Sequence, residues 1–447
     1  MSTSDKRPPT RLKRFSKLAK MTASVAGTYT KAKLGSIFED EQGRAKALSQ
    51  AHSANGEVMA QTLGQLKGAV MKVGQMASVA EDILPKEMAD ALGKLQKDSP
   101  PMSYDVIAEQ IASELGDAPE RLFDAFDTAP FAAASIGQVH RAVFDGREVV
   151  VKVQYPGVDE SCDSDLNHLR RTLRMSGFVN SRHHKRALDT MFEEIRLRIH
   201  EELDYCIEAD HVRRFQELHA RDPWVVIPEV VGERSAQRVL TMTYEPGDHL
   251  DVLRTDAYDQ DTRNLIGERL IWMFGHQIFE HKLLHADPNP GNYAFRENGD
   301  VVLYDFGCVK EIEPKLASMY RDMADAMAAG NYVRVDRMLE LMGARNPDAK
   351  APADAFYAEW RDVLLAPFLE HETFDYATAT VSEDATSSSR VSDALKHMNT
   401  FQPAADLVFI DRVVVGMYHN LCTFDPVVPW RALFKEFMEI PQIDYDD

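Results

Sequence analysis

Residues 285–292 read His-Ala-Asp-Pro-Asn-Pro-Gly-Asn, and the triplet Asp305-Phe306-Gly307 begins thirteen residues after Asn292. This H-x-D-x-x-x-x-N … D-F-G order is typical of a kinase-type phosphoryl-transfer site. That chemistry needs one aspartate at the attacking hydroxyl or water, and an asparagine and a second aspartate on Mg²⁺. The sequence therefore predicts Asp287 in the first role, and Asn292 and Asp305 as metal ligands. The alternative is a pair of unrelated surface turns, and the strand-like run 301–304 directly before Asp305 argues against it.

A site of this kind also needs a lysine on a strand to hold the α- and β-phosphates. Lys152 ends the run Val149-Val150-Val151-Lys152 and occupies that place. A lysine among valines on a buried strand is costly unless it meets an anion. A lysine that snorkels from the strand edge is the weaker alternative, because the downstream half of the pattern exists.

The lysine in turn needs a carboxylate partner on a helix. We predict Glu202 as this partner, in the stretch Glu201-Glu202-Leu203-Asp204-Tyr205. Glu193, Glu194 and Glu201 are nearby competitors. In so acidic a stretch, a solvated face is the default interpretation of any one of them.

A phosphate-covering loop is expected ahead of the lysine strand, but a G-x-G-x-x-G is absent from this chain. The sequence has an alanine-rich run, 132–140, at this place. Alanine has less access to positive φ than glycine, so this loop should be stiffer and should approach phosphate differently. The predicted nucleotide-binding residues of the loop are Ala133, Ala134, Ser135, Ile136 and Gly137.

A strand expected over 238–244 leads into Glu245-Pro246-Gly247, which suits a hinge between two lobes. This order places Met242 near the adenine pocket. It also predicts that backbone groups around Glu245 bind the base.

The sequence predicts that the chain is divided into four segments. A basic flexible leader, 1–35, precedes a helical extension, 36–118. A small strand-rich lobe with a helical insert, 119–247, is followed by a large helical lobe, 248–447. Within the small lobe, Asp145-Gly146 joins two strand-like runs and is a hairpin signal. The chain has 447 residues, which is enough for two or three domain-sized units.

Charge is unevenly distributed. The net charge of -20 argues against a general nucleic-acid binder. Residues 1–35 nevertheless carry +8, and the leader lacks the apolar centre of a signal peptide. An organelle transit peptide, a membrane-surface segment and a disordered tail all stay open. No stretch approaches the roughly 18 consecutive apolar residues of a membrane span.

With these residues assembled, the chain resembles the UbiB/AarF family of atypical kinase-like proteins associated with ubiquinone biosynthesis. The resemblance covers roughly residues 55–330. The family's KxGQ motif matches 72–75, its alanine-rich loop 132–140, its lysine strand 151–157, its ExD motif 202–204, its catalytic loop 285–292 and its DFG 305–307. Asn289 stands where the family commonly has His.

This resemblance implies an α+β, protein-kinase-like two-lobe fold with an N-terminal helical extension. It implies ATP and Mg²⁺ as cofactors. It also implies that the KxGQ segment packs over the mouth of the active site, where Lys72 and Gln75 would restrain nucleotide or substrate choice. The alanine loop disfavours protein phosphorylation, so an ATPase or a kinase for a small or lipid-like molecule is the expected output.

Two further classes of function stay open from the sequence. One is a nucleotide-gated scaffold that recruits biosynthetic partners without turnover, and the other is a protein kinase. Expected partners are quinone-precursor lipids, biosynthetic enzymes and an anionic membrane surface. Glycines on the N-terminal helix leave room for a homodimer. The expected location is the cytoplasm, with or without peripheral membrane attachment, or an organellar matrix if the leader is a transit peptide.

Overall fold

The computed structural model describes most of the chain and divides it into two compact units. The described residues are 11–35, 41–64, 101–134, 136–175, 188–189, 192–193, 195–196, 199–200, 202–379, 400–402 and 404–445. Unit 1 comprises Met1–Asp210 and Glu229–Tyr244, and unit 2 comprises His211–Pro228 and Glu245–Asp447. Segment 211–228 therefore belongs to unit 2, whereas the sequence placed it in the small lobe.

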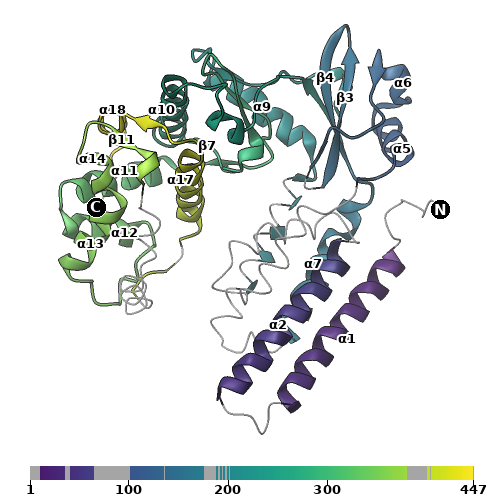
Figure 1. The fold of residues 1–447 in the computed structure, drawn as a ribbon, viewed down its shortest axis with the longest axis horizontal. Helices are drawn as coiled ribbons and strands as arrows, with labels where there is room; N and C mark the ends of the chain where they lie inside the picture. The colour runs from purple at the N-terminus through teal and green to yellow at the C-terminus, as the bar shows by residue number, and fades with distance from the viewer. Residues whose placement is uncertain are drawn as a thin grey trace. The chain divides into compact units, whose positions relative to one another are not determined.

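Unit 1 is built on an antiparallel sheet (Figure 1). Strands β3 (Gly137–Phe144) and β4 (Arg147–Gln154) form the predicted hairpin, and both turn residues have positive φ, 50° at Asp145 and 70° at Gly146. Such a turn matches the twist of the strands. The order is β1-β3-β4-β6 with β2 on β3. The further strands are β1 (Ala125–Phe126), β2 (Ala132–Ala133) and β6 (Val239–Thr243).

One face of this sheet packs against helix α5 (Tyr104–Leu115). Alternate side chains of β4, namely Val149, Val151 and Val153, share a buried cluster with Ile107 and Ile111 of α5. Because strand side chains alternate between faces, Lys152 points to the opposite face. The predicted helix over 104–115 is therefore confirmed, and its packing decides which way the lysine faces.

Two long helices near the N-terminus lie side by side in unit 1, α1 (Arg11–Gly35) and α2 (Glu41–Gly64) (Figure 1). Met21 of α1 is 1% exposed, and Asn55 of α2 donates to the carbonyl of Val25 at 3.4 Å. The Thr22 hydroxyl is 2.7 Å from the hydroxyl of Thr172 on α7 (Val158–Met175). The prediction of a flexible leader is therefore wrong for residues 11–35, because this basic helix has an apolar face to bury.

Unit 2 is mainly helical, with short strands that carry the predicted catalytic turns. Strand β5 (Val225–Val226) pairs in parallel with β9 (Val301–Leu303), which pairs with β8 (Tyr293–Phe295). Strand β7 (Leu283–His285) pairs with β10 (Val309–Glu311), and β11 (Phe374–Asp375) pairs with β12 (Val427–Val428). Helix α9 (Tyr205–Leu218) begins in unit 1 and ends in unit 2. The described α-helices that lie wholly in unit 2 are α10 (Gln260–His276), α11 (Pro314–Ala328), α12 (Tyr332–Leu341), α13 (Asp354–Leu364), α14 (Ala366–Leu369), α17 (Ala405–Phe424) and α18 (Trp430–Glu439). Within the described ranges, no helix has both the length and the apolarity that crossing a bilayer requires.

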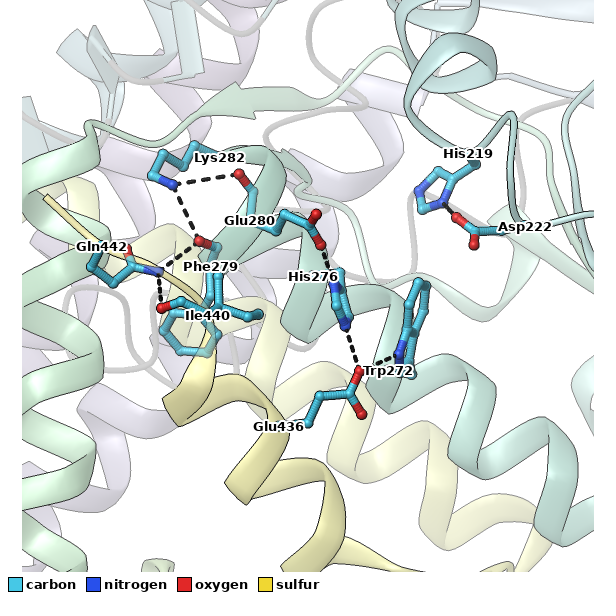
Figure 2. Close-up of polar contacts among 10 residues, drawn as sticks. All are labelled: His219, Asp222, Trp272, His276, Phe279, Glu280, Lys282, Glu436, Ile440 and Gln442. Atoms are coloured by element: carbon cyan, nitrogen blue, oxygen red, sulfur yellow. Dashed lines mark hydrogen bonds and ion pairs between the residues drawn. The ribbon is translucent and has the colours of Figure 1, made fainter.

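A polar network attaches α18 to α10 near the strand that leads into the catalytic loop (Figure 2). The Trp272 ring stacks on His276 with centroids 3.9 Å apart, and the Trp272 indole donates to Glu436 at 2.9 Å. The two ring nitrogens of His276 contact Glu280 at 2.5 Å and Glu436 at 3.0 Å. Carboxylates on both sides of one ring hold it in place, so the end of α10 has a defined orientation.

His219 is a second buried histidine of unit 2, and its burial makes stability depend on pH. Nδ1 lies 3.0 Å from Asp222 (Figure 2), whereas Nε2 has no hydrogen-bond partner among the described residues. Burial lowers the pKa of His219 below its usual value. Between that lowered pKa and an unfolded value of about 6.5, the unfolded chain binds more protons. Stability should therefore fall as the pH drops below about 6.5.

We expect His219→Asn, which keeps a donor for Asp222 but does not titrate, to flatten this dependence. The measurement is the urea midpoint at a series of pH values from 7.5 down to 5.5. His419→Asn, at an exposed position, is the matched control. Equal slopes for wild type and His219→Asn would show that His219 does not contribute.

Candidate active site

The Lys152 ammonium lies on β4 in a buried ion pair within unit 1. Its Nζ donates to both carboxylate oxygens of Glu208, at 2.7 and 2.9 Å. The side chains are 11% and 4% exposed, so both charges are largely removed from water. The Tyr205 ring lies 5.2 Å from Nζ and adds a cation–π contact. A pair this short and buried holds the lysine in one orientation.

Glu208 therefore forms the ion pair with Lys152 that the sequence predicted for Glu202. Glu202 precedes a turn at Leu203 and Asp204, after which helix α9 (Tyr205–Leu218) begins. The Glu202 backbone carbonyl accepts a hydrogen bond from the Gln154 side-chain amide at 3.2 Å. Glu208 lies on the buried stripe of α9. A carboxylate on an otherwise apolar stripe was the available sequence signal for Glu208. The buried positions of α9 are Tyr205, Glu208, Ala209, Val212 and Phe215.

The described part of the alanine-rich run contains the short strand β2. Ala133 pairs with Gln138 across β2 and β3, and the Ala134 N–H donates to the Gly137 carbonyl at 3.0 Å. Ala133 is exposed, whereas the Ile136 side chain is 1% exposed and belongs to the core of the sheet. A Cβ at Gly137 would lie 2.3 Å from the Val153 carbonyl oxygen, so glycine is required there. Ser135, Lys72 and Gln75 lie outside the described residues.

Met242 and Glu245 are found in separate units. Met242 on β6 pairs with Val150 while Leu240 pairs with Lys152, so Met242 is on the lysine face of the sheet. Glu245 is in unit 2, where its carbonyl accepts from the Tyr304 hydroxyl at 2.7 Å. Its carboxylate accepts from Arg296 at 2.8 Å. The backbone at Glu245 is thus fixed by the residue directly before the DFG triplet.

The catalytic loop and the DFG triplet are joined by His285, which is 0% exposed. Its Nε2 lies 2.5 Å from the Asp305 carbonyl. Because a carbonyl only accepts, Nε2 carries the proton. Nδ1 lies 3.1 Å from the Tyr293 hydroxyl, which is also 3.2 Å from the Asp287 carbonyl. Burial lowers the pKa of His285, so the ring is neutral at neutral pH.

Aromatic packing stabilises the link between His285 and the DFG triplet. Phe306 is 0% exposed and packs against Phe215 and His285, with centroids 5.1 and 5.5 Å away. His211 Nδ1 lies 3.0 Å from the Phe306 carbonyl. The DFG backbone is therefore held by two histidines and a buried ring, and Asp305 is fixed relative to the catalytic loop.

Asp287 and Asn292 form a second hydrogen-bonded pair in unit 2. The Asn292 amide nitrogen donates to Asp287 Oδ2 at 3.0 Å and approaches the Asp287 carbonyl at 3.3 Å. Asp287 Oδ1 lies 3.2 Å from Nη2 of Arg412 on α17, a partner that the sequence did not indicate. Both carboxylate oxygens thus have a donor.

The donor set fits Mg²⁺, which prefers oxygen ligands. Because the Asn292 nitrogen is engaged with Asp287, its amide oxygen points away from that carboxylate. Asp305 supplies a carboxylate whose Oδ1 accepts from the Gly307 N–H at 2.9 Å, which fixes its direction. Asn292 and Asp305 are therefore the residues that would hold the ion.

Comparison with known proteins agrees with this geometry. The model of the ABC1 atypical kinase-like domain matches residues 94–339, more than half of the chain. The chain belongs to this family. The resemblance to UbiB/AarF proteins inferred from the six motifs is thereby confirmed, and so is the α+β kinase-like fold.

Its relatives include atypical kinases from several kingdoms. Zebrafish atypical kinase COQ8B, mitochondrial, is 32% identical over 74% of this chain and 53% of its own length. Yeast atypical kinase COQ8, mitochondrial, is 31% identical over 69% and 62%. The solved complex of Rv3197 with erythromycin from Mycobacterium tuberculosis is 26% identical to this chain and has a TM-score of 0.62. The superposition covers 89% of this chain and 98% of Rv3197. The chain thus spans about half the length of the zebrafish relative.

The Lys152–Glu208 pair predicts a specific pattern of stability. Glu208→Ala leaves a buried ammonium without its carboxylate, so we expect the free energy of unfolding to fall by about 3 kcal/mol. Glu217→Ala, at an exposed position of the same helix α9, is the matched control and should cost much less. The double variant Lys152→Met/Glu208→Leu should recover most of the loss, because it removes both charges. Urea titration measures all three, and an equal cost at both glutamates would contradict the assignment.

Proposed function

We propose that this chain binds Mg-ATP and catalyses phosphoryl transfer, as an ATPase or as a kinase for a small or lipid-like acceptor. The observation that carries the proposal is the bonded set in unit 2. His285 joins the catalytic loop to Asp305, and within that loop the Asn292 amide donates to the Asp287 carboxylate. The fixed lysine of unit 1 supplies the cation that such chemistry needs for the phosphates.

In this proposal each residue has one role. Lys152, held by Glu208, contacts the α- and β-phosphates, and Asn292 and Asp305 hold Mg²⁺, which would offset the charge of the triphosphate. Asp287 orients the acceptor hydroxyl or water. The acceptor oxygen bonds to the γ-phosphorus, the bond from that phosphorus to the β–γ bridging oxygen breaks, and ADP leaves. The acceptor proton passes to Asp287.

The proposed setting is isoprenoid quinone biosynthesis, in line with the UbiB/AarF family. The names of the zebrafish and yeast relatives call them mitochondrial, and an Arabidopsis relative, Protein ACTIVITY OF BC1 COMPLEX KINASE 8, is called chloroplastic. We propose quinone-precursor lipids and biosynthetic enzymes as partners. The basic helix α1 would bring the chain to an anionic membrane surface, which vesicle sedimentation with and without residues 1–35 tests.

Removal of Asp305 tests the proposal directly. We expect Asp305→Asn to lower Mg-dependent phosphate release from labelled ATP by about 100-fold or more, because the metal loses its carboxylate. The exposed Asp256→Asn in the same unit is the matched control. Release by Asp305→Asn at the wild-type rate would refute the assignment of the metal site.

The same assay, run with liposomes and a quinone-precursor mimic, separates the classes of function. Free phosphate identifies an ATPase, and labelled lipid identifies a lipid kinase. Transfer to added protein would identify a protein kinase, and binding without release would identify a nucleotide-gated scaffold. The hydrogen bonds that orient Asp287 and Asp305 favour turnover over the scaffold.

Lys72 and Gln75 are proposed to restrain nucleotide choice, in line with the KxGQ motif of the family. Exchange of Lys72 for a neutral residue should change the preference between ATP and ADP, or induce autophosphorylation. Measured affinities for the two nucleotides and label incorporation check this. If neither changes, the motif is structural only.

A further inference from the structure

Helix α17 contacts the catalytic loop through three residues spaced four apart, Arg412, Gly416 and Asn420. Residues at this spacing lie on one face of a helix. Arg412 reaches Asp287, whereas Gly416 and Asn420 contact Pro288, the next residue along the loop. All of these residues belong to unit 2. One face of α17 thus packs against the catalytic loop at Asp287 and Pro288.

The approach of α17 to Pro288 is close and specific. A Cβ at Gly416 would lie 2.3 Å from Pro288 Cγ, a distance that real Cβ atoms do not reach. The Asn420 amide donates to the Pro288 carbonyl at 2.8 Å, and Asn420 is 6% exposed. Gly416 therefore sets how closely the helix approaches the loop, and the buried Asn420 amide sets the position of the helix along it.

Arg412 completes the hydrogen bonding of the Asp287 carboxylate. Its Nη2 lies 3.2 Å from Oδ1, while the Asn292 amide lies 3.0 Å from Oδ2. With a donor on each oxygen, the Asp287 carboxylate has one preferred orientation. The side chains of Arg412 and Asp287 are 33% and 27% exposed, so this ion pair is partly shielded from water.

We propose that Arg412 is a positioning residue of the active site, which acts on the acceptor through Asp287, and that α17 is part of the catalytic apparatus. This inference rests on the proposed phosphoryl-transfer function. Arg412 orients the carboxylate that receives the acceptor proton, and Gly416 lets the helix come close enough for it to do so. The C-terminal region therefore determines turnover and does not merely support the fold.

The first experiment compares Arg412→Gln, Arg412→Lys and Arg412→Ala in the full chain, with Mg-ATP turnover and Mg-ATP affinity measured separately. Misorientation of Asp287 should lower kcat of Arg412→Gln about 10- to 100-fold. The affinity for Mg-ATP should stay within about twofold, because the Arg412 side chain bonds to Asp287, which is proposed to orient the acceptor and not to bind the nucleotide. Arg412→Lys should recover part of kcat, and added guanidinium ion should restore part of the activity of Arg412→Ala.

The control for these variants is Arg431→Gln on α18. Arg431 is exposed, and the described structure gives it no ion pair. It should keep wild-type turnover and affinity. A loss of kcat in Arg431→Gln of the same size would show that the assay responds to any lost arginine and would overturn the inference.

A second pair of variants tests the helix without touching any charged group. Gly416→Ala should push α17 away from Pro288 and reduce kcat as Arg412→Gln does, although alanine is the better helix former. Gly27→Ala on α1, where an added Cβ meets nothing within 4 Å, is the matched control. Wild-type kcat in Gly416→Ala would contradict the proposed role of α17.

The possible results separate the two proposals. If wild type turns over and Arg412→Gln is equally fast or faster, the positioning role is refuted and the proposed function stands. If Arg412→Gln loses Mg-ATP affinity along with turnover, the role is structural and the inference is also refuted. If wild type releases no phosphate and transfers no label, the proposed function fails, and the inference fails with it.

Discussion

A neutral, fully buried histidine is the constraint on which the site in unit 2 depends. His285 donates to the Asp305 carbonyl and faces the Tyr293 hydroxyl, so one ring joins the catalytic loop to the DFG triplet. Burial keeps the ring uncharged, and its tautomer follows from the carbonyl it contacts. Other hydrogen bonds orient each aspartate carboxylate, and His285 adds the link between the two turns that carry them.

The second constraint is the partnership of the strand lysine. Lys152 faces away from the core because the neighbouring valines of β4 pack against α5. Its partner depends on which face of α9 is buried. Glu208 lies on that buried face, whereas Glu202 precedes the turn before the helix. Two buried charges of opposite sign are stable together and costly apart, so the pair specifies orientation more than it adds stability.

Helix α17 of the C-terminal region contacts the loop of the proposed active site directly, which its composition does not indicate. In the sequence, Asp411 and Arg412 simply interrupt an apolar run. In the structure, that interruption brings a guanidinium to the carboxylate of Asp287, while α18 is attached to α10 through His276 and Glu436 (Figure 2). Helices α17 and α18, which come long after the motifs in the sequence, thus contribute to how the loop 285–292 and its neighbours are held.

The sequence alone determined the family, the helix over 104–115 and the hairpin at Asp145-Gly146, because these depend on local spacing and turn chemistry. It could not determine Glu208, Arg412 or the membership of segment 211–228. Each of these depends on which helical face is buried, or on a strand pairing between distant segments, such as β5 with β9. Such choices follow from the packing of whole elements, and only the tertiary structure decides them.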